Sequence, residues 1–242
     1  MNLKFWNRQS YVLESPLKTN GIDISMFKRI IGYEDYKILF AKAVTSQYKL
    51  NIMCVGAKGT GKSEFLKEIE RKYKDKVIYI DGASTTTKAG LRDILFKKGS
   101  STKFLLVDEI NLLDAKDLAI FLSLAQDNRI TVTMNKTYKT LQLYNLKIFG
   151  TCNFLPDNKK ISAAINDRFD IWKFKPYEYD QLLEIALYCL RDRIKNKELI
   201  TYIVNRVYYD LHSSSMRDIM DISAYNIKNA AEVDHYIATK MG

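Results

Sequence analysis

The chain has 242 residues, a mass of 28.1 kDa and 47% hydrophobic residues, which is enough to bury a sizeable core and too long for a short peptide fold. Only 3 Pro and 10 Gly are present, which excludes a collagen-like chain and argues against a largely disordered one. The formal net charge of +10 favours a polyanionic partner without naming one.

Several features are those expected of a cytoplasmic protein with no membrane partner. No apolar run approaches the roughly 18 to 20 residues of a membrane-spanning helix, and the first residues lack the apolar stretch of a secretory signal. Cys54, Cys152 and Cys189 are odd in number and far apart, as expected of free thiols in a reducing compartment. His212 and His235 have no partners at ligand spacing, so a zinc site is not expected.

In chain order, the sequence first predicts a short helix from Asp23 to Gly32 and a second helix from Tyr33 to about Tyr48. From residue 51, short β-rich apolar runs alternate with helical stretches, which is typical of a parallel sheet joined by crossover helices. The predicted strands are Asn51–Val55, Val77–Ile80, Lys103–Val107, Leu146–Thr151 and Ile171–Phe174. The predicted helices between them are Lys62–Tyr73, Lys88–Lys97, Ala115–Gln126 and Ile161–Asp167.

The segment from Arg129 to Leu143 interrupts this alternation. Apolar and polar residues alternate on both sides of Met-Asn-Lys-Thr, which predicts a β-hairpin inserted before the fourth strand of the sheet. The surrounding stretch from Asn128 to Lys160 has six Lys or Arg and a single Asp. The hairpin is therefore expected to lie in a basic part of the chain.

After Pro176 the strand pattern stops, and residues 179–241 predict three or four amphipathic helices. The expected division is an N-terminal extension at 1–30, an α/β nucleotide-binding domain at 31–176 and a small helical lid at 177–242. The fold class is accordingly α/β.

The most specific motif is the phosphate-binding loop, or P-loop. Its residues Gly56-Ala57-Lys58-Gly59-Thr60-Gly61-Lys62-Ser63 match G-x-x-x-x-G-K-[ST] throughout, after a predicted strand and at the start of a predicted helix. In such a loop, backbone amides and the helix N-terminus surround the phosphates. Lys62 is expected to reach the β and γ phosphates and Ser63 to bind Mg²⁺. We therefore predict ATP and Mg²⁺ as ligands.

Two acids follow the third predicted strand. Asp108 and Glu109 come directly after Phe104-Leu-Leu-Val, and the carboxyl ends of the strands are where open α/β sheets bind ligands. Asp108 is suited to holding the magnesium ion, and Glu109 to orienting and deprotonating the attacking water. Alone, two acids after a strand would indicate a solvated loop, but with the P-loop they predict nucleotide hydrolysis.

These motifs resemble the AAA+ ATPase superfamily, in the family's order, from Ile31 to Ala224. The resemblance implies a five-stranded parallel sheet flanked by helices, with a helical lid. Ile31-Gly32-Tyr33-Glu34-Asp35 is similar to the segment that packs on the adenine, so Ile31 and Gly32 are implied in cofactor binding. GAKGTGKS and LLVDEI are similar to Walker A and Walker B.

Three later segments resemble further AAA+ elements. Phe149-Gly-Thr-Cys-Asn153 resembles sensor 1, which implies that Asn153 holds the lytic water or the γ-phosphate. Asn166-Asp-Arg168-Phe-Asp170 resembles the arginine-finger motif, which implies that Arg168 completes the site of a neighbouring subunit in a ring, typically a hexamer. Ser215-Met-Arg217-Asp218 resembles sensor 2, although a surface salt bridge would also explain Arg217.

Within the superfamily, Thr86-Thr-Lys-Ala-Gly90-Leu91 and the hairpin look most like the clade of MCM helicases and MoxR-type ATPases. In MCM-like rings such a hairpin touches DNA, which implies a nucleic-acid role for Lys136, Tyr138 and Lys139. The region between Gly82 and Lys103 is too short for the long helix-2 insert of MCM proteins, and no separate N-terminal DNA-binding domain or winged helix is recognised. Processive helicase activity is therefore not implied.

The leading hypothesis is a ring-forming ATPase that remodels or translocates nucleic acid in replication or recombination. One alternative is a MoxR-like protein-remodelling ATPase, since Tyr138 can contact a peptide as well as a base. Another is a slow nucleotide-gated loader or switch. ATPase rates with DNA and with unfolded protein would separate these three classes.

Overall fold

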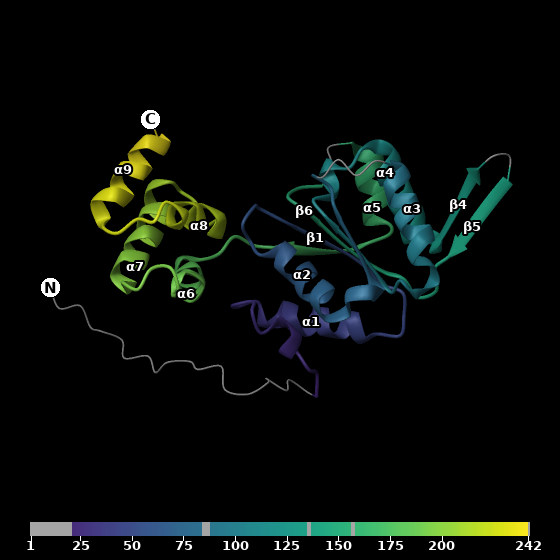
Figure 1. The fold of residues 1–242 in the computed structure, drawn as a ribbon, viewed down its shortest axis with the longest axis horizontal. Coiled ribbons are helices and arrows are strands. Elements are labelled where there is room, and N and C mark those ends of the chain that lie inside the picture. The colour runs from purple at the N-terminus through teal and green to yellow at the C-terminus, as the bar shows by residue number, and fades with distance from the viewer. Residues whose placement is uncertain (1–20, 84–87, 135–136, 156–157, 242) are drawn as a thin grey trace.

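The computed structural model describes residues 21–83, 88–134, 137–155 and 158–241 (Figure 1). Its centre is a parallel sheet of five strands in the order β2-β3-β6-β1-β7. Helices cover both faces of the sheet, and the segment after β7 leads into a helical bundle on the left of Figure 1. The expected α/β class and five-stranded parallel sheet are confirmed.

Every strand end of the sheet lies within one residue of its predicted position. The strands are β1 (Asn51–Gly56), β2 (Val77–Asp81), β3 (Phe104–Asp108), β6 (Lys147–Cys152) and β7 (Asp170–Phe174). The sheet helices are α1 (Glu34–Thr45), α2 (Lys62–Tyr73), α3 (Lys88–Lys98), α4 (Ala115–Asp127) and α5 (Lys159–Asn166). Single 3-10 turns are found at Ser25–Phe27, Lys74–Lys76, Gly99–Ser101 and Ile110–Leu112.

Two apolar clusters fill the two faces of the sheet. Successive side chains of a strand point to opposite faces, so in β1 Ile52 packs with α1 and α2 while Met53 packs with α3, α4 and α5. Figure 1 shows the same three-layer arrangement. The layers hold the carboxyl ends of β1, β3 and β6 together at one edge of the sheet.

The N-terminal part differs from the expectation. Instead of a helix from Asp23 to Gly32, only the 3-10 turn Ser25–Phe27 forms, and α1 starts at Glu34. Gly32 and Tyr33 have φ values of 70° and 57°. This left-handed conformation cannot continue a right-handed helix, so it separates the two segments.

The expected hairpin is present as two antiparallel strands, β4 (Arg129–Met134) and β5 (Thr137–Gln142), which form a separate sheet. It projects beyond the α3 and α4 side of the molecule (Figure 1). Lys136 lies outside the described residues, and the side chains of Tyr138 and Lys139 are not described either.

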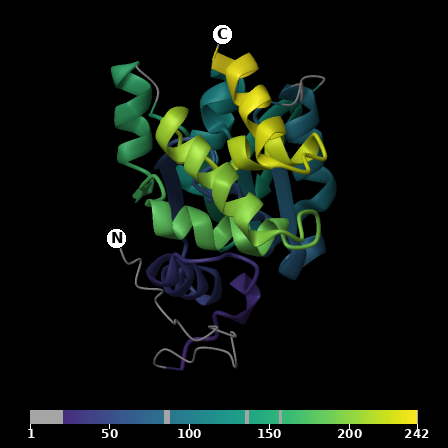
Figure 2. The same ribbon diagram turned by 90° about the vertical axis from the view of Figure 1, so that its left-hand side faces the viewer.

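The residues after β7 form a helical bundle with an apolar centre of its own, which faces the viewer in Figure 2. Asn196 and Ser215 cap two of its helices, each accepting a hydrogen bond from the first turn. Over the described part of the chain, no helix is long and apolar enough to cross a membrane. The bundle, called here the C-terminal bundle, consists of α6 (Tyr179–Leu190), α7 (Lys197–Asn205) with a π-helical turn at Arg206–Asp210, α8 (Met216–Ala224) and α9 (Ala230–Met241).

Candidate functional site

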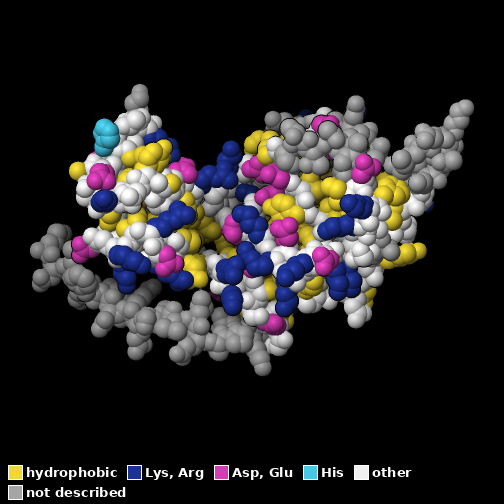
Figure 3. Space-filling model, in the orientation of Figure 1, with side chains coloured by type: hydrophobic (Ala, Val, Ile, Leu, Met, Phe, Trp, Pro, Cys, Tyr) yellow, Lys and Arg dark blue, Asp and Glu magenta, His cyan; other side chains and the backbone are white. Residues whose placement is uncertain are grey.

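A cavity of about 490 Å³ lies where the carboxyl ends of β1, β3 and β6 meet the C-terminal bundle. In Figure 3, Lys and Arg side chains gather across the middle of the molecule. The cavity brings together ten of the predicted site residues with other residues of β6 and α8. Its lining includes Lys58, Gly59, Thr60, Gly61, Lys62, Ser63, Asp108, Glu109, Thr151, Asn153, Met216, Arg217 and Met220.

Two P-loop glycines are required by both conformation and space. Gly59 and Gly61 have φ values of +76° and +80°, which residues with a side chain rarely adopt. A Cβ at Gly59 would lie 2.1 Å from Ser215 Oγ, and one at Gly61 would lie 2.6 Å from Tyr177 Oη. The P-loop is therefore packed directly against the bundle and the segment leading into it.

Lys62 begins α2 and is buried at the base of the loop. Its Nζ donates hydrogen bonds to Gly56 O and Ala57 O, both at 2.7 Å, and lies 3.4 Å from Asn153 Oδ1. Burial lowers the pKa of Lys62 below its usual value. The ammonium group thus lies between the P-loop and the end of β6, where a bound phosphate would replace the carbonyl oxygens as its partner.

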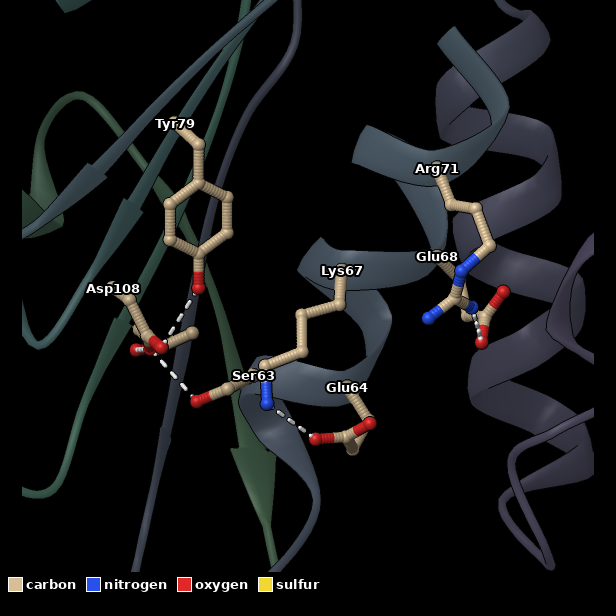
Figure 4. A network of polar contacts seen from close by, with 8 residues as sticks. Ser63, Glu64, Lys67, Glu68, Arg71, Tyr79 and Asp108 are labelled. Atoms are coloured by element: carbon tan, nitrogen blue, oxygen red, sulfur yellow. Dashed lines mark hydrogen bonds and ion pairs between the residues drawn. The ribbon is translucent and has the colours of Figure 1, made fainter. Parts of the chain in front are cut away.

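Asp108 is held by side chains from three other elements (Figure 4). Ser63 Oγ donates to its Oδ1 at 2.8 Å, Thr151 Oγ1 donates to the same oxygen, and Tyr79 Oη donates to Oδ2 at 2.9 Å. Burial and the nearby Asp108 carboxylate raise the pKa of Tyr79 well above its usual value. Its hydroxyl therefore remains a proton donor to the carboxylate over the physiological pH range.

Glu109 has an unusual backbone conformation for a residue with a side chain, with φ of 51°. Its amide donates to Thr151 Oγ1 at 3.0 Å, and a Cβ at Gly82 would lie 2.3 Å from its carbonyl oxygen. Such left-handed residues cost about 1 to 3 kcal/mol and persist where their surroundings fix them. Here the contacts with Gly82 after β2 and Thr151 of β6 fix the backbone of Glu109, which lines the cavity.

The residues present fit a magnesium ion that is shared with a nucleotide. The Ser63 hydroxyl and the Asp108 carboxylate, 2.8 Å apart, are the oxygen ligands that Mg²⁺ prefers. Among the residues with described placement, no group of three or more His, Cys, Asp or Glu could hold a metal. Phosphate oxygens and water would therefore have to complete the coordination, as is usual for Mg²⁺ at such sites.

Three other predicted residues lie away from this cavity. Ile31 and Gly32 line a separate small cavity of about 20 Å³ beside Tyr33 and α6. Arg168 is also absent from the lining of the main cavity. Its guanidinium donates to Gln126 Oε1 at 2.7 and 3.2 Å and to Ala164 O at 3.0 Å.

The sequence did not single out Tyr79, Thr151 or Ser215. Thr151 lies on β6 two residues before Asn153, which follows the strand, and Tyr79 carries a polar group within the apolar run from Val77 to Ile80 of β2. Both features are visible in the sequence, but neither residue can be assigned as a neighbour of Asp108 until the order of the strands in the sheet is known. Ser215 meets Gly59 only through the folding of the bundle.

A family model described as the AAA domain (dynein-related subfamily) matches residues 51–169, which contain the P-loop, Asp108, Asn153 and Arg168. Residues 51–169 of this chain therefore form a domain of the AAA+ superfamily.

The AAA+ chain is similar at low identity to MCM proteins. It is 23% identical to the zygotic DNA replication licensing factor mcm6-A of Xenopus laevis, over 86% of this chain and 29% of that protein. It is 26% identical to the maternal DNA replication licensing factor mcm6 of Xenopus tropicalis, over 77% of this chain and 27% of that protein. The chain thus spans less than a third of these relatives.

Solved structures show the same AAA+ fold. The RuvB Holliday junction branch migration motor of Thermotoga maritima superposes with a TM-score of 0.60 at 16% identity, covering 86% of this chain and 70% of that one. A RuvB variant from the same organism gives a TM-score of 0.64 at 16% identity, covering 87% of this chain and 71% of that one.

Proposed function

We propose that this AAA+ protein is an ATP hydrolase that assembles into a ring and uses hydrolysis to remodel or translocate DNA. The observation that carries the hydrolase assignment is the convergence of Lys62, Ser63, Asp108, Glu109 and Asn153 on one cavity. They come from α2, β3 and the end of β6, and together they supply the charges that phosphoryl transfer needs.

In this proposal each residue has a separate task. Lys62 leaves the P-loop carbonyl oxygens and pairs with the β and γ phosphates, while the P-loop amides from Lys58 onward hold the phosphates at the N-terminus of α2. Asn153, 3.4 Å from Lys62 Nζ, donates its amide to the γ-phosphate or the attacking water. Arg217, which lines the cavity from α8, binds phosphate from the opposite side.

The acids complete the mechanism. Ser63 and Asp108 would hold Mg²⁺, which when bound neutralises charge on the β and γ phosphates. Glu109 then orients the water and accepts its proton as general base. The contacts of its backbone with Thr151 and Gly82 keep Glu109 at the wall of the cavity.

We propose that Arg168 acts in a neighbouring subunit. It does not line the cavity of its own chain, and a guanidinium supplied from outside stabilises charge on the transferring phosphoryl group. A ring, most simply a homohexamer, supplies every cavity with one such residue. Ile31 and Gly32, beside α6, are proposed to contact the adenine, and residues 31–176 and 177–242 to form the nucleotide-binding domain and the helical lid.

DNA is the proposed substrate for two reasons. The MCM relatives are named DNA replication licensing factors and the RuvB neighbour a Holliday junction branch migration motor. In addition, this chain has a net charge of +10 and a projecting hairpin whose sequence carries Lys136, Tyr138 and Lys139. Lysines bind phosphates and a tyrosine stacks on bases.

Two measurements test the proposal. Isothermal titration should show ATP binding in wild type, loss of binding in Lys62→Ala and retention in Lys72→Ala, an exposed lysine in the last turn of the same helix that does not line the cavity. Equal affinity in all three proteins would refute the nucleotide site.

The second measurement is the ATPase rate with single-stranded DNA, duplex DNA or an unfolded protein. Stimulation by DNA supports the proposed substrate. Stimulation by the unfolded protein alone would instead support protein remodelling, and a slow rate unchanged by all three would support a loader or switch.

A further inference from the structure

Asp108 lines two different cavities of the molecule. One is the 490 Å³ cavity that contains the P-loop. The other is an open groove of about 1070 Å³ along the edge strand β2, between α2 and α3, which Asp108 and Tyr79 both line. Asp108 therefore needs contacts on both sides to keep one orientation.

The contacts on the two carboxylate oxygens are different. Oδ1 accepts hydrogen bonds from Ser63 and Thr151, which both line the nucleotide cavity. Oδ2 accepts a hydrogen bond from Tyr79 of β2, whose hydroxyl points at Asp108 in Figure 4. Without the hydroxyl, the carboxylate is held only by the two contacts on Oδ1, and Oδ2 is left with the groove beside it.

The hydroxyl has no role in the packing of the strand. The ring of Tyr79 packs against the cluster on the α1 and α2 face, a task for which phenylalanine would serve equally well. The described partner of the hydroxyl is Asp108. The hydroxyl on this apolar strand is therefore explained by its hydrogen bond to the Asp108 carboxylate rather than by packing in the core.

We propose that Tyr79 is a positioning residue that fixes the Asp108 carboxylate and so sets the affinity of the nucleotide site for Mg²⁺. The inference rests on the proposed nucleotide site and names a residue that the P-loop and acid motifs do not include. Partners that orient a metal-binding group typically change metal affinity by about 10 to 100-fold when removed.

The test compares Tyr79→Phe with wild type in the full chain, by titrating Mg²⁺ into protein and a fluorescent ATP analogue. The half-saturating Mg²⁺ concentration should rise about tenfold, while affinity for the analogue in EDTA stays unchanged. With Ca²⁺ the rise should be smaller, because Ca²⁺ tolerates irregular coordination and Mg²⁺ requires a near-ideal octahedron.

A matched control is Tyr202→Phe, which removes an equivalent hydrogen bond, 2.7 Å from Tyr202 Oη to Asp234 Oδ1, within the C-terminal bundle. It should leave the Mg²⁺ titration unchanged. The inference is overturned if Tyr79→Phe titrates like wild type, if it shifts Mg²⁺ and Ca²⁺ equally, or if it unfolds or weakens metal-free binding. Wild type that binds no nucleotide would instead refute the proposed function itself.

Discussion

Replacing Gly59 with alanine tests the contact between the P-loop and the C-terminal bundle. The φ of +76° at Gly59 adds a cost of about 1 to 2 kcal/mol for any residue with a Cβ. The new Cβ would also lie 2.1 Å from Ser215 Oγ and 2.9 Å from Ser215 Cα. Because the second atom is backbone, a rotamer change cannot relieve the overlap, and α8 must shift.

The two costs can be separated with a control glycine. Gly99 has φ of +60°, but nothing lies within 4 Å of the position of its Cβ. Gly99→Ala should therefore lose only the conformational part, about 1 to 2 kcal/mol. Gly59→Ala should lose a further 1 to 3 kcal/mol or so, the usual cost of inserting atoms into a packed contact.

Urea denaturation of both variants measures this difference in the free energy of unfolding. Ser215→Gly removes Oγ and Cβ and should itself cost only about a few tenths of a kcal/mol, since glycine is tolerated as an N-cap. The double variant Gly59→Ala with Ser215→Gly should regain about 1 kcal/mol of the loss. Equal losses in Gly59→Ala and Gly99→Ala, with no recovery in the double variant, would refute the packing argument.

Three further predictions concern the proposed activity. Glu109→Gln should bind ATP normally but turn over at least about 10²-fold more slowly, as measured by phosphate release, because an amide cannot accept the proton of water; near wild-type turnover would place the base elsewhere. Lys136→Ala combined with Lys139→Ala should weaken DNA binding and reduce the slope of log affinity against log salt by roughly one unit per lost phosphate contact, with basal ATPase retained; an unchanged slope would favour protein remodelling. Arg168→Ala should lower the ATPase rate by about 10³-fold, and mixing it with Lys62→Ala should restore part of the activity because each variant supplies what the other lacks. A mixture as inactive as its components would contradict a shared site.

The sequence by itself determined the elements and the phosphate-binding loop. Apolar runs and their spacing gave each sheet strand to within one residue and α2 from Lys62 to Tyr73 without error, because these patterns depend on neighbouring residues only. The P-loop is equally local, since Gly59, Gly61, Lys62 and Ser63 are placed by the turn that links a strand to a helix. The helix predicted from Asp23 to Gly32 was wrong, since only the 3-10 turn Ser25–Phe27 forms there, whereas α1 starts within one residue of its predicted position.

Only the tertiary structure decided which side chains surround the acids. Tyr79 is 29 residues and Thr151 43 residues from Asp108, yet both donate to its carboxylate because β2 and β6 lie on either side of β3. The alternation of apolar and polar residues along a strand indicates which face of the sheet a side chain lies on, but it does not indicate which strand lies next to it. In the same way, the contact of Ser215 with Gly59 depends on how the C-terminal bundle packs against the sheet, since long-range packing is set by the shapes of whole elements and leaves no local pattern in the sequence.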